Sequence, residues 1–182
     1  GSSDNCGILN RRLSKSIFDC TDIGVNSVYL IVTDVNGNTD SAIAIVNVVD
    51  LINPIVITQP VTVILDQDGK ASIALSDIDN GSSDNCVIAS RSLSKTSFDC
   101  SQIGDNIVIL TVTDENGNSN SASSVVTVKD DLKPTVITQP SIVILDNNGN
   151  GSISSSDIDN GSIDNCDIAN ISLSRSNFDC SD

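Results

Sequence analysis

The chain has 182 residues and carries 9 Lys and Arg against 24 Asp and Glu, which gives a formal net charge of −15. A surface this acidic repels nucleic acid, so we expect no DNA or RNA partner. Histidine and tryptophan are absent, which removes the usual general base and the commonest metal-binding imidazole, and argues against an enzyme. Hydrophobic residues make up 38% of the chain, enough for a folded core, and the abundance of Asp and Asn favours turns over helices. The composition therefore predicts an all-β protein.

No stretch of the sequence approaches the roughly 20 apolar residues that cross a bilayer, so we expect no direct insertion into a membrane. The first residues already belong to repeated sequence and include no signal peptide. We therefore expect a segment of a longer protein that continues at both ends.

The sequence repeats with a period of 80 residues. The hexapeptide at 1–6 recurs at 81–86 and again, with one change, at 161–166. Residues 1–80 and 81–160 agree at roughly 48 of 80 positions without a gap. A unit of this length suits a small independent β-domain repeated in tandem rather than one turn of a solenoid.

Two proline-containing segments mark the predicted joints between units, Val49–Pro54 and Lys129–Pro134. Proline fixes its own φ and holds the residue before it extended, so these joints are expected to be stiff. The joints divide the chain into a C-terminal part of one immunoglobulin-like repeat at 1–50, a complete repeat at 51–130, and an N-terminal part of a further repeat at 131–182.

Six segments of the central unit are short, rich in β-branched residues and bounded by turns, and they are predicted to be strands. In chain order they are Ile55–Thr58, Val61–Leu65, Ala71–Ala74, Val87–Leu93, Asn106–Val112 and Ser121–Val128. Gly- and Asn-bearing turns separate them at 66–69 and at 114–118, where the last two strands form a hairpin. Six or seven strands in 80 residues predict an immunoglobulin-like β-sandwich. Phe18, Phe98 and Phe178 recur once per unit and are expected to anchor the core rather than bind a ligand.

The cysteines form one pair in each unit, with 13 residues between the partners. We expect each unit to close its own disulfide, because this arrangement treats every copy alike and leaves no Cys unpaired. The expected bridges are Cys6–Cys20, Cys86–Cys100 and Cys166–Cys180. Closing a loop of about 15 residues is worth roughly 3 kcal/mol. Zinc is the rival interpretation, but two Cys per unit without His do not supply its usual four ligands. Disulfides in every unit predict an oxidising compartment, the cell exterior or the periplasm.

An acidic loop precedes the first Cys of each unit. In the central unit it offers hard oxygen donors from Asp77, Asp79, Asp84 and Asn85, which form a candidate calcium site. The alternative is that these residues cap a helical turn and satisfy the backbone of the loop, as Asp and Asn often do. The loop lacks the Glu and the spacing of a known calcium loop, so calcium is a candidate ligand and no cofactor is required.

The hairpin segments at 34–40 and 114–120 resemble the start of an EF-hand loop, but both lack the bidentate Glu at its end. A plain hairpin turn is the favoured interpretation. Calcium at the acidic loops or at the joint formed by Asp130 and Asp131 would offset the self-repulsion of the chain and stiffen the array.

The central unit resembles a hyalin-type (HYR) repeat, an immunoglobulin-like extracellular module associated with adhesion. The resemblance rests on Asp84–Cys86, Thr111–Asn118 and Val125–Val128. Together with Leu93–Cys100 and Pro134–Gln139, the unit is more closely similar to repeats of very large surface adhesins of gliding Bacteroidetes, the SprB type. This resemblance covers the whole chain.

One departure from the hyalin pattern concerns the cysteines. Thr58–Pro60 and Ser119–Asn120 stand where the family usually has a Cys near the opening strand and another after the hairpin. The disulfide layout of the family therefore does not transfer to this chain. The resemblance implies export by type IX secretion, display on the outer membrane, and contact with the motility and secretion machinery through other regions of the parent protein.

The sequence thus predicts a non-enzymatic structural segment of a secreted, surface-displayed filamentous adhesin, which acts in adhesion and gliding motility as a disulfide-stapled stiff rod. The alternative is an extracellular module that binds a carbohydrate or protein ligand, with or without calcium. Asp77 and Asp79 could also form a catalytic pair, but acidic turn residues recur in every unit and nothing else indicates a cleft. The external surface or ligand is not identified by the sequence.

Overall fold

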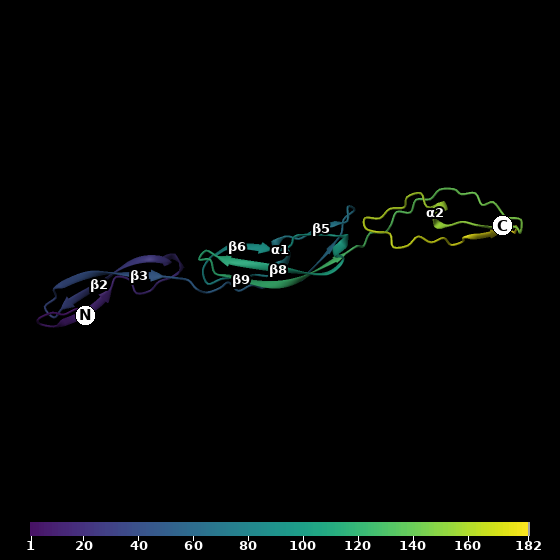
Figure 1. Ribbon diagram of the computed structural model, residues 1–182. Helices are drawn as coiled ribbons and strands as arrows, with labels where there is room; N and C mark the ends of the chain where they lie inside the picture. The colour runs from purple at the N-terminus through teal and green to yellow at the C-terminus, as the bar shows by residue number, and fades with distance from the viewer. Residues whose placement is uncertain (182) are drawn as a thin grey trace. The chain divides into compact units, whose positions relative to one another are not determined.

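Short β-strands joined by Gly- and Asn-rich turns make up most of the regular structure of residues 1–181, which a computed structural model describes (Figure 1). The predicted all-β fold class is therefore confirmed. None of the described helices is long and apolar enough to cross a bilayer.

The chain divides into two compact units, each assembled from separate segments. Unit 1 consists of Gly1–Val56, Ser82–Arg91 and Thr111–Asn120. Unit 2 consists of Ile57–Gly81, Ser92–Leu110 and Ser121–Asp182. The division into repeats at residues 50 and 130 stays a prediction.

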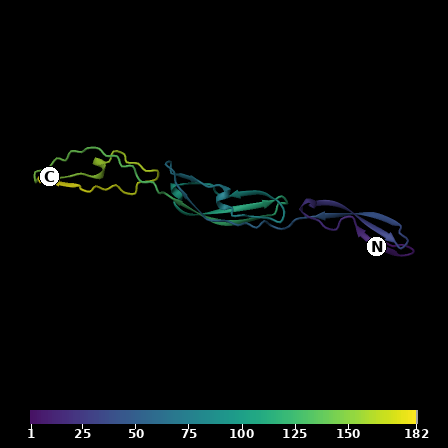
Figure 2. The ribbon, with the colours of Figure 1, turned by 180° about the vertical axis from the view of Figure 1, so that it is seen from behind.

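A three-stranded antiparallel sheet in the order β1-β2-β3 forms the first part of unit 1. Its strands are β1 (Ile8–Leu13), β2 (Gly24–Asp34) and β3 (Thr39–Val48). Strands β2 and β3 form a long hairpin whose pairing runs from Gly24 opposite Val48 to Thr33 opposite Thr39. Figure 2 shows this hairpin from behind. The turn between the strands contains Gly37 at φ +90°, as the Asn-Gly sequence predicts for a hairpin.

Two further sheets have the order of an immunoglobulin-like sandwich. The first is a four-stranded sheet in the order β4-β9-β8-β6, in which β4 pairs parallel to β9. The second pairs β5 with β7 antiparallel. The strands are β4 (Val61–Ile64), β5 (Lys70–Ser72), β6 (Ile88–Leu93), β7 (Ser97–Asp99), β8 (Gly104–Asp114) and β9 (Ser119–Lys129). The chain thus alternates between two sheets, as the strands of a Greek-key sandwich do.

Alternate residues of the long strands are buried, which is the period of a strand with one face on a core. On β8, Val108, Leu110 and Val112 are fully buried, and Val126 and Val128 alternate in the same way on β9. Polar or exposed residues stand between them. The pattern of β-branched residues therefore fixes both the strands and the face that each turns inward.

The conserved position of Phe in the repeat has different surroundings in each copy. Phe98 is 3% exposed, which agrees with its predicted role as a core anchor. Phe18 and Phe178 are half-buried. A cation lies over each ring, with Lys95 Nζ 4.9 Å from the centre of the Phe98 ring. We infer that the ring of Phe98 contributes most to packing among the three.

Four short elements do not appear among the predicted strands. They are the helix α1 (Leu75–Ile78), the strand β7 and the 3₁₀ turns at Cys20–Asp22 and Cys100–Gln102. The prediction of a strand at 55–58 is wrong. This segment forms isolated β-bridges, of Ile55 with Ser83 and of Thr58 with Asp79, in place of a regular strand. Each of these elements has four residues or fewer, so hydrophobic periodicity gives little signal for them.

Residues 131–181 repeat the second small sheet. Strand β10 (Asn150–Ser152) pairs antiparallel with β11 (Asn177–Asp179), and the helix α2 (Ser155–Ile158) corresponds to α1. Residues 141–144 correspond to β4 but form no strand, and Ile142 is 90% exposed. In the central unit, the corresponding strand β4 pairs with β9.

Candidate metal site and disulfide cross-links

Two disulfides link residues on opposite sides of the predicted joints. Cys20 is bonded to Cys86 and Cys100 to Cys166, and both pairs are separated by 66 positions. In both, the Cα atoms are 5.6 Å apart. Cys6 and Cys180 are free and exposed. The predicted bridges Cys6–Cys20, Cys86–Cys100 and Cys166–Cys180 are therefore wrong.

The strand between the two cysteines of a unit explains the error. Strand β1 lies between Cys6 and Cys20, and β6 and β7 lie between Cys86 and Cys100. A six-residue strand at about 3.3 Å per residue spans about 20 Å, whereas a disulfide needs Cα atoms less than about 7 Å apart. The observed bridges Cys20–Cys86 and Cys100–Cys166 do not have to span these strands.

A glycine lies against the second disulfide. Gly69 adopts φ +67° in the turn that follows β4, and its backbone oxygen is 3.8 Å from Cys100 Sγ. A Cβ atom at this position would lie 2.6 Å from the backbone oxygen of Asn165 and 2.7 Å from Cys100 Sγ. Both the backbone conformation and the close approach require glycine here. Gly149 repeats the arrangement against Cys180, with φ +80°.

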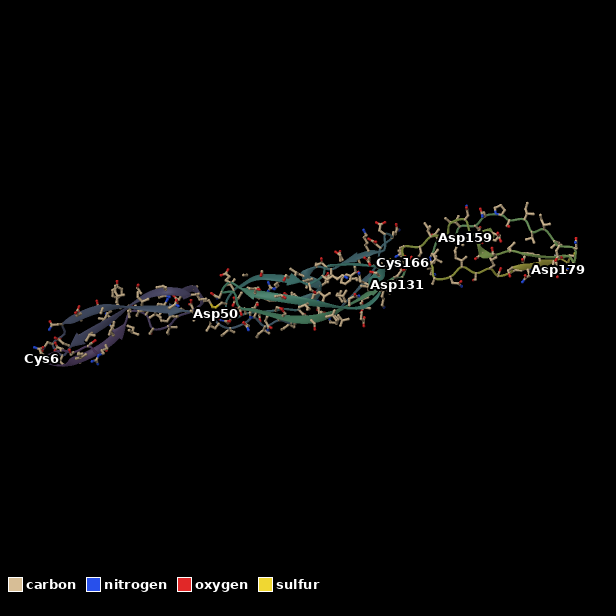
Figure 3. All side chains as sticks on the ribbon, in the orientation of Figure 1. Cys6, Asp50, Asp131, Asp159, Cys166 and Asp179 are labelled. Atoms are coloured by element: carbon tan, nitrogen blue, oxygen red, sulfur yellow. A yellow bond between two sulfur atoms is a disulfide. The ribbon has the colours of Figure 1, made fainter. Side chains whose placement is uncertain are left out.

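Three carboxylates meet in unit 1. One oxygen from each of Asp50, Asp84 and Asp114 lies within 4.8 Å of the others. Asp50, labelled in Figure 3, follows β3 in the first predicted joint, Asp84 lies in the loop before β6, and Asp114 ends β8. We call these three residues the joint cluster. The cluster unites a joint, an acidic loop and a hairpin, which are far apart in the sequence.

Asp114 is the most buried member of the joint cluster, with 2% of its surface exposed. Its Oδ1 accepts hydrogen bonds from the backbone N–H groups of Asn116 and Asn118, at 2.9 and 2.8 Å, and its Oδ2 accepts one from Asn118 Nδ2 at 2.7 Å. Burial raises the pKa of Asp114. The hydrogen bonds from the Asn118 amide and the backbone N–H groups lower the pKa by more than burial raises it, so the pKa lies below the usual value. Asp114 is therefore ionised at neutral pH.

Asp84 has one carboxylate oxygen without a hydrogen bond. Its Oδ2 accepts from the backbone N–H of Cys86 at 2.9 Å. Its Oδ1 is buried and has no hydrogen-bond partner among the described residues. In unit 2, Oδ1 atoms of Asp164 and Asn165, one period later, are likewise buried and unpartnered within the described part of the chain. A buried polar atom without a partner costs free energy, so a ligand that supplies the missing interaction would stabilise the loop.

Asp50 completes the joint cluster with side-chain amides around it. Asn85 Nδ2 donates to Asp50 Oδ2 at 3.2 Å, Asn116 Nδ2 donates to the same atom at 3.4 Å, and Asn118 Nδ2 donates to the Asp50 backbone oxygen at 3.2 Å. Rotation of the Asn85 or Asn116 amide by 180° exchanges its nitrogen for its oxygen. These two side chains can therefore donate to Asp50 or present oxygen to a cation.

The donor set fits Ca²⁺. Calcium takes six to eight oxygen ligands at 2.3–2.6 Å, so oxygens around one ion lie within about 5 Å of one another. The joint cluster supplies three carboxylates with this spacing, and the neighbouring Asn side chains supply further oxygens. Three like charges so close together repel one another, and a divalent cation would offset that repulsion.

The predicted calcium residues are divided between this cluster and a helix. Asp84 belongs to the joint cluster and Asn85 donates to it. Asp77 instead caps α1, because its Oδ2 accepts from the backbone N–H of Ala74 at 2.7 Å. Asp79 is the C-cap residue of the same helix, and its backbone N–H donates to the Leu75 oxygen. The alternative interpretation of Asp77 as a helix cap is thus the one that the structure supports.

Sequence reasoning missed Asp50 and Asp114 as members of this cluster. Asp114 was read as part of a plain hairpin turn, and its hydrogen bonds to Asn116 and Asn118 do close that turn. The joint was considered for calcium only in its second copy, at Asp130 and Asp131. A signal was present, since Asp50 and Asp84 both recur one period later, as Asp130 and Asp164.

Each unit has a surface depression among its described residues. One, of about 380 Å³, is lined in unit 1 by residues that include Ser2, Leu30 and Asp40. The other, of about 410 Å³, is lined in unit 2 by residues that include Leu132 and Ile163. Neither has an aromatic side chain in its lining. Neither therefore offers the aromatic platform that a carbohydrate or protein ligand commonly uses.

Comparisons with known proteins give no assignment. No family model and no curated protein matches the chain. Among solved structures, the chain is similar to the protocadherin gammaB7 EC3-6 cis-dimer structure, with 17% sequence identity and a TM-score of 0.34. The match covers 83% of this chain and 42% of the protocadherin chain. With a TM-score below 0.5, this likeness defines neither the function nor the partners of the chain. The two disulfides fit a protein that folds in an oxidising compartment, as extracellular modules do.

Proposed function

We propose that the chain is a structural segment of a secreted, surface-displayed filamentous adhesin, in which tandem immunoglobulin-like repeats are cross-linked across their joints. The observation that carries this proposal is the pair of disulfides, each joining residues 66 positions apart on either side of a predicted joint. A cross-link at each joint suits a protein that transmits force along its length. The absence of histidine and the lack of aromatic residues in both depressions favour a structural role over catalysis or glycan binding.

Adhesion, gliding motility, type IX secretion and attachment to the outer membrane are part of the proposal. The resemblance to repeats of large adhesins of gliding Bacteroidetes supports them. Disulfides also require an oxidising compartment, which agrees with export.

Antibodies and an in-frame deletion test this proposal in the cells that produce the protein. Antibodies raised against the chain should label intact cells and mark a surface-attached filament. Deletion of residues 81–160 from the parent protein removes one full period and keeps the order of cysteines, so it serves as a control that shortens the filament and retains adhesion. Loss of the whole protein should abolish attachment to surfaces. Labelling that appears only after cells are permeabilised would refute surface display.

We also propose that the joint cluster binds one Ca²⁺ and stiffens the first joint. The unpartnered, buried Oδ1 of Asp84 and the three carboxylates within 4.8 Å support this proposal. Binding to the folded state alone stabilises a protein by about 2.7 kcal/mol when the free ion is at 100 times its dissociation constant. The melting temperature should therefore rise with Ca²⁺ and fall on addition of a chelator.

A matched pair of variants separates this site from the general charge of the chain. Asp84→Asn and Asp68→Asn each remove one negative charge, but Asp68 is exposed and lies outside the joint cluster. Titration calorimetry with CaCl₂ should give one strong site in the wild type and in Asp68→Asn, and none in Asp84→Asn. Equal melting temperatures of the wild type in Ca²⁺ and in chelator would refute the site.

A further inference from the structure

The two disulfides change the covalent path by which tension passes along the chain. Cys20–Cys86 closes a loop that contains residues 21–85, and Cys100–Cys166 closes a loop that contains residues 101–165. When the two ends of the chain are pulled apart, the shortest covalent route crosses both disulfides. Tension then runs through residues 1–20, 86–100 and 166–182, and the two loops lie outside that route.

We propose that the disulfides make this chain a tether of limited extension, which keeps most of each repeat out of the load path. Only 14 positions separate Cys86 from Cys100, which at about 3.5 Å per residue is about 50 Å when fully stretched. The disulfide adds the 5.6 Å between its Cα atoms. Without the cross-links, a full period of 80 residues would stretch to about 280 Å. The cross-links thus reduce the maximal length of a period about fivefold.

The residues inside and outside the load path have different structural roles. The segment between Cys86 and Cys100 contains β6 and β7, which are short. The closed loops contain β4, β5, β9 and almost all of the buried core, including Val108, Leu110 and Val126. All three members of the joint cluster also lie inside the loops. A loop whose ends are held together by a disulfide has lost much of its unfolded-state entropy, so strands within one loop, such as β8 and β9, stay close together under overload and are ready to pair again.

The periodic positions of the remaining cysteines agree with this arrangement. Cys180 occupies the same position in the period as Cys100, and its Sγ is 3.7 Å from the Gly149 oxygen, as Cys100 Sγ is 3.8 Å from the Gly69 oxygen. Cys6 occupies the position of Cys86. Both free thiols are exposed. The pattern of one cross-link per joint is therefore a property of the repeat and not of one copy.

This inference deepens the proposed function, because a filament that attaches a cell to a surface bears tension. Its test reads the length of a stretched chain and does not involve adhesion. A chain that failed to adhere could still have the proposed load path, and an adhesin could lack it. The two proposals therefore fail separately.

Single-molecule stretching of the full chain measures the load path directly. Handles are attached to peptide tags at the two termini rather than to thiols, and the contour length is read at forces that unfold β-domains. The proposal predicts a contour length of about 180 Å in the oxidised protein, from 49 backbone steps of about 3.5 Å and two disulfides. With a phosphine reductant, which gives two electrons to each disulfide and leaves two thiols, the length should rise to about 640 Å.

Two double variants locate the effect in particular cross-links. Removal of one disulfide in Cys100→Ser/Cys166→Ser should lengthen the oxidised chain to about 410 Å, because it returns residues 101–165 to the load path. Cys6→Ser/Cys180→Ser should leave the length at about 180 Å, since neither thiol is bonded. The readout is covalent length, so it does not depend on the stability of either variant.

Two results would overturn the proposal. A length of about 500 Å in the oxidised protein would mean that each C-x13-C pair is bonded within its own unit. A length of about 640 Å without reductant would mean that no disulfide crosses the load path.

Discussion

Removal of the Cys100–Cys166 disulfide should destabilise unit 2 by about 4 kcal/mol. The double variant Cys100→Ser/Cys166→Ser keeps the size of both side chains and removes only the cross-link. The two residues are 66 positions apart, and the chain-entropy model assigns about 4 kcal/mol at 25 °C to a closed loop of that length. At roughly 4–8 °C per kcal/mol for a domain of 60–100 residues, the melting temperature should fall by about 15–30 °C.

Far-UV circular dichroism of the full chain measures this effect, since the chain lacks tryptophan. The control is Cys6→Ser/Cys180→Ser, which removes two exposed, unbonded thiols and should melt as the wild type does. Both proteins are melted in buffer without reductant. The reasoning would be refuted if Cys100→Ser/Cys166→Ser melted with the wild type, or if the control variant lost the stability instead.

Three further predictions concern single side chains. Gly69→Ala should destabilise the protein by more than Gly81→Ala. Both glycines have positive φ, but only a Cβ at position 69 would meet Cys100 Sγ and a backbone oxygen. The difference between the urea midpoints of the two variants measures the cost of this close contact. The melting temperature should fall as the pH drops from 3.8, the unfolded pKa of Asp114, through its lower folded pKa. The lowered folded pKa means that the ionised carboxylate stabilises the fold, and protonation removes that stability. A pH series in which Asp114→Asn and the wild type lose equal stability would contradict this. Phe98→Ala should lower the free energy of unfolding by about 3–5 kcal/mol, measured by denaturant unfolding, and Phe178→Ala should lower it clearly less. The reason is that Phe98 is 3% exposed whereas Phe178 is half-buried. Equal losses would show that the two rings pack alike.

The strands were predictable from the sequence because their signal is local. Val108, Leu110 and Val112 alternate with exposed or partly exposed residues, and Val126 and Val128 do the same on the partner strand. The hairpin turns carry Asn-Gly at fixed places, which sets the connection between β8 and β9. A strand with a long alternating pattern therefore identifies itself without any knowledge of its neighbours.

The disulfide pairing could not be predicted from the repeat alone. Pairing within a unit and pairing of Cys20 with Cys86 both treat every copy alike, so symmetry does not distinguish them. The deciding quantity is the distance in space between the cysteines, and the fold brings the Cα atoms of each bonded pair to 5.6 Å. Attention to the extended strand between the partners would have favoured the longer connection.

The joint cluster was only half predictable for a related reason. Asp84 and Asn85 lie in a visibly acidic loop, so the sequence identifies them as oxygen donors. Asp50 and Asp114 come from a joint and from a hairpin, and only the fold brings their carboxylates to within 4.8 Å of Asp84. A search for ligands within one continuous loop therefore selected Asp77, which instead caps α1.

Disulfide mapping of the native protein by trypsin and mass spectrometry, without reduction, tests the cross-links most directly. The positions of Lys and Arg place all six cysteines on different tryptic peptides. The account predicts that peptide 16–70 is bonded to 71–91 and that 96–129 is bonded to 130–175. Peptide 1–11 bonded to 16–70, or 71–91 bonded to 96–129, would contradict it.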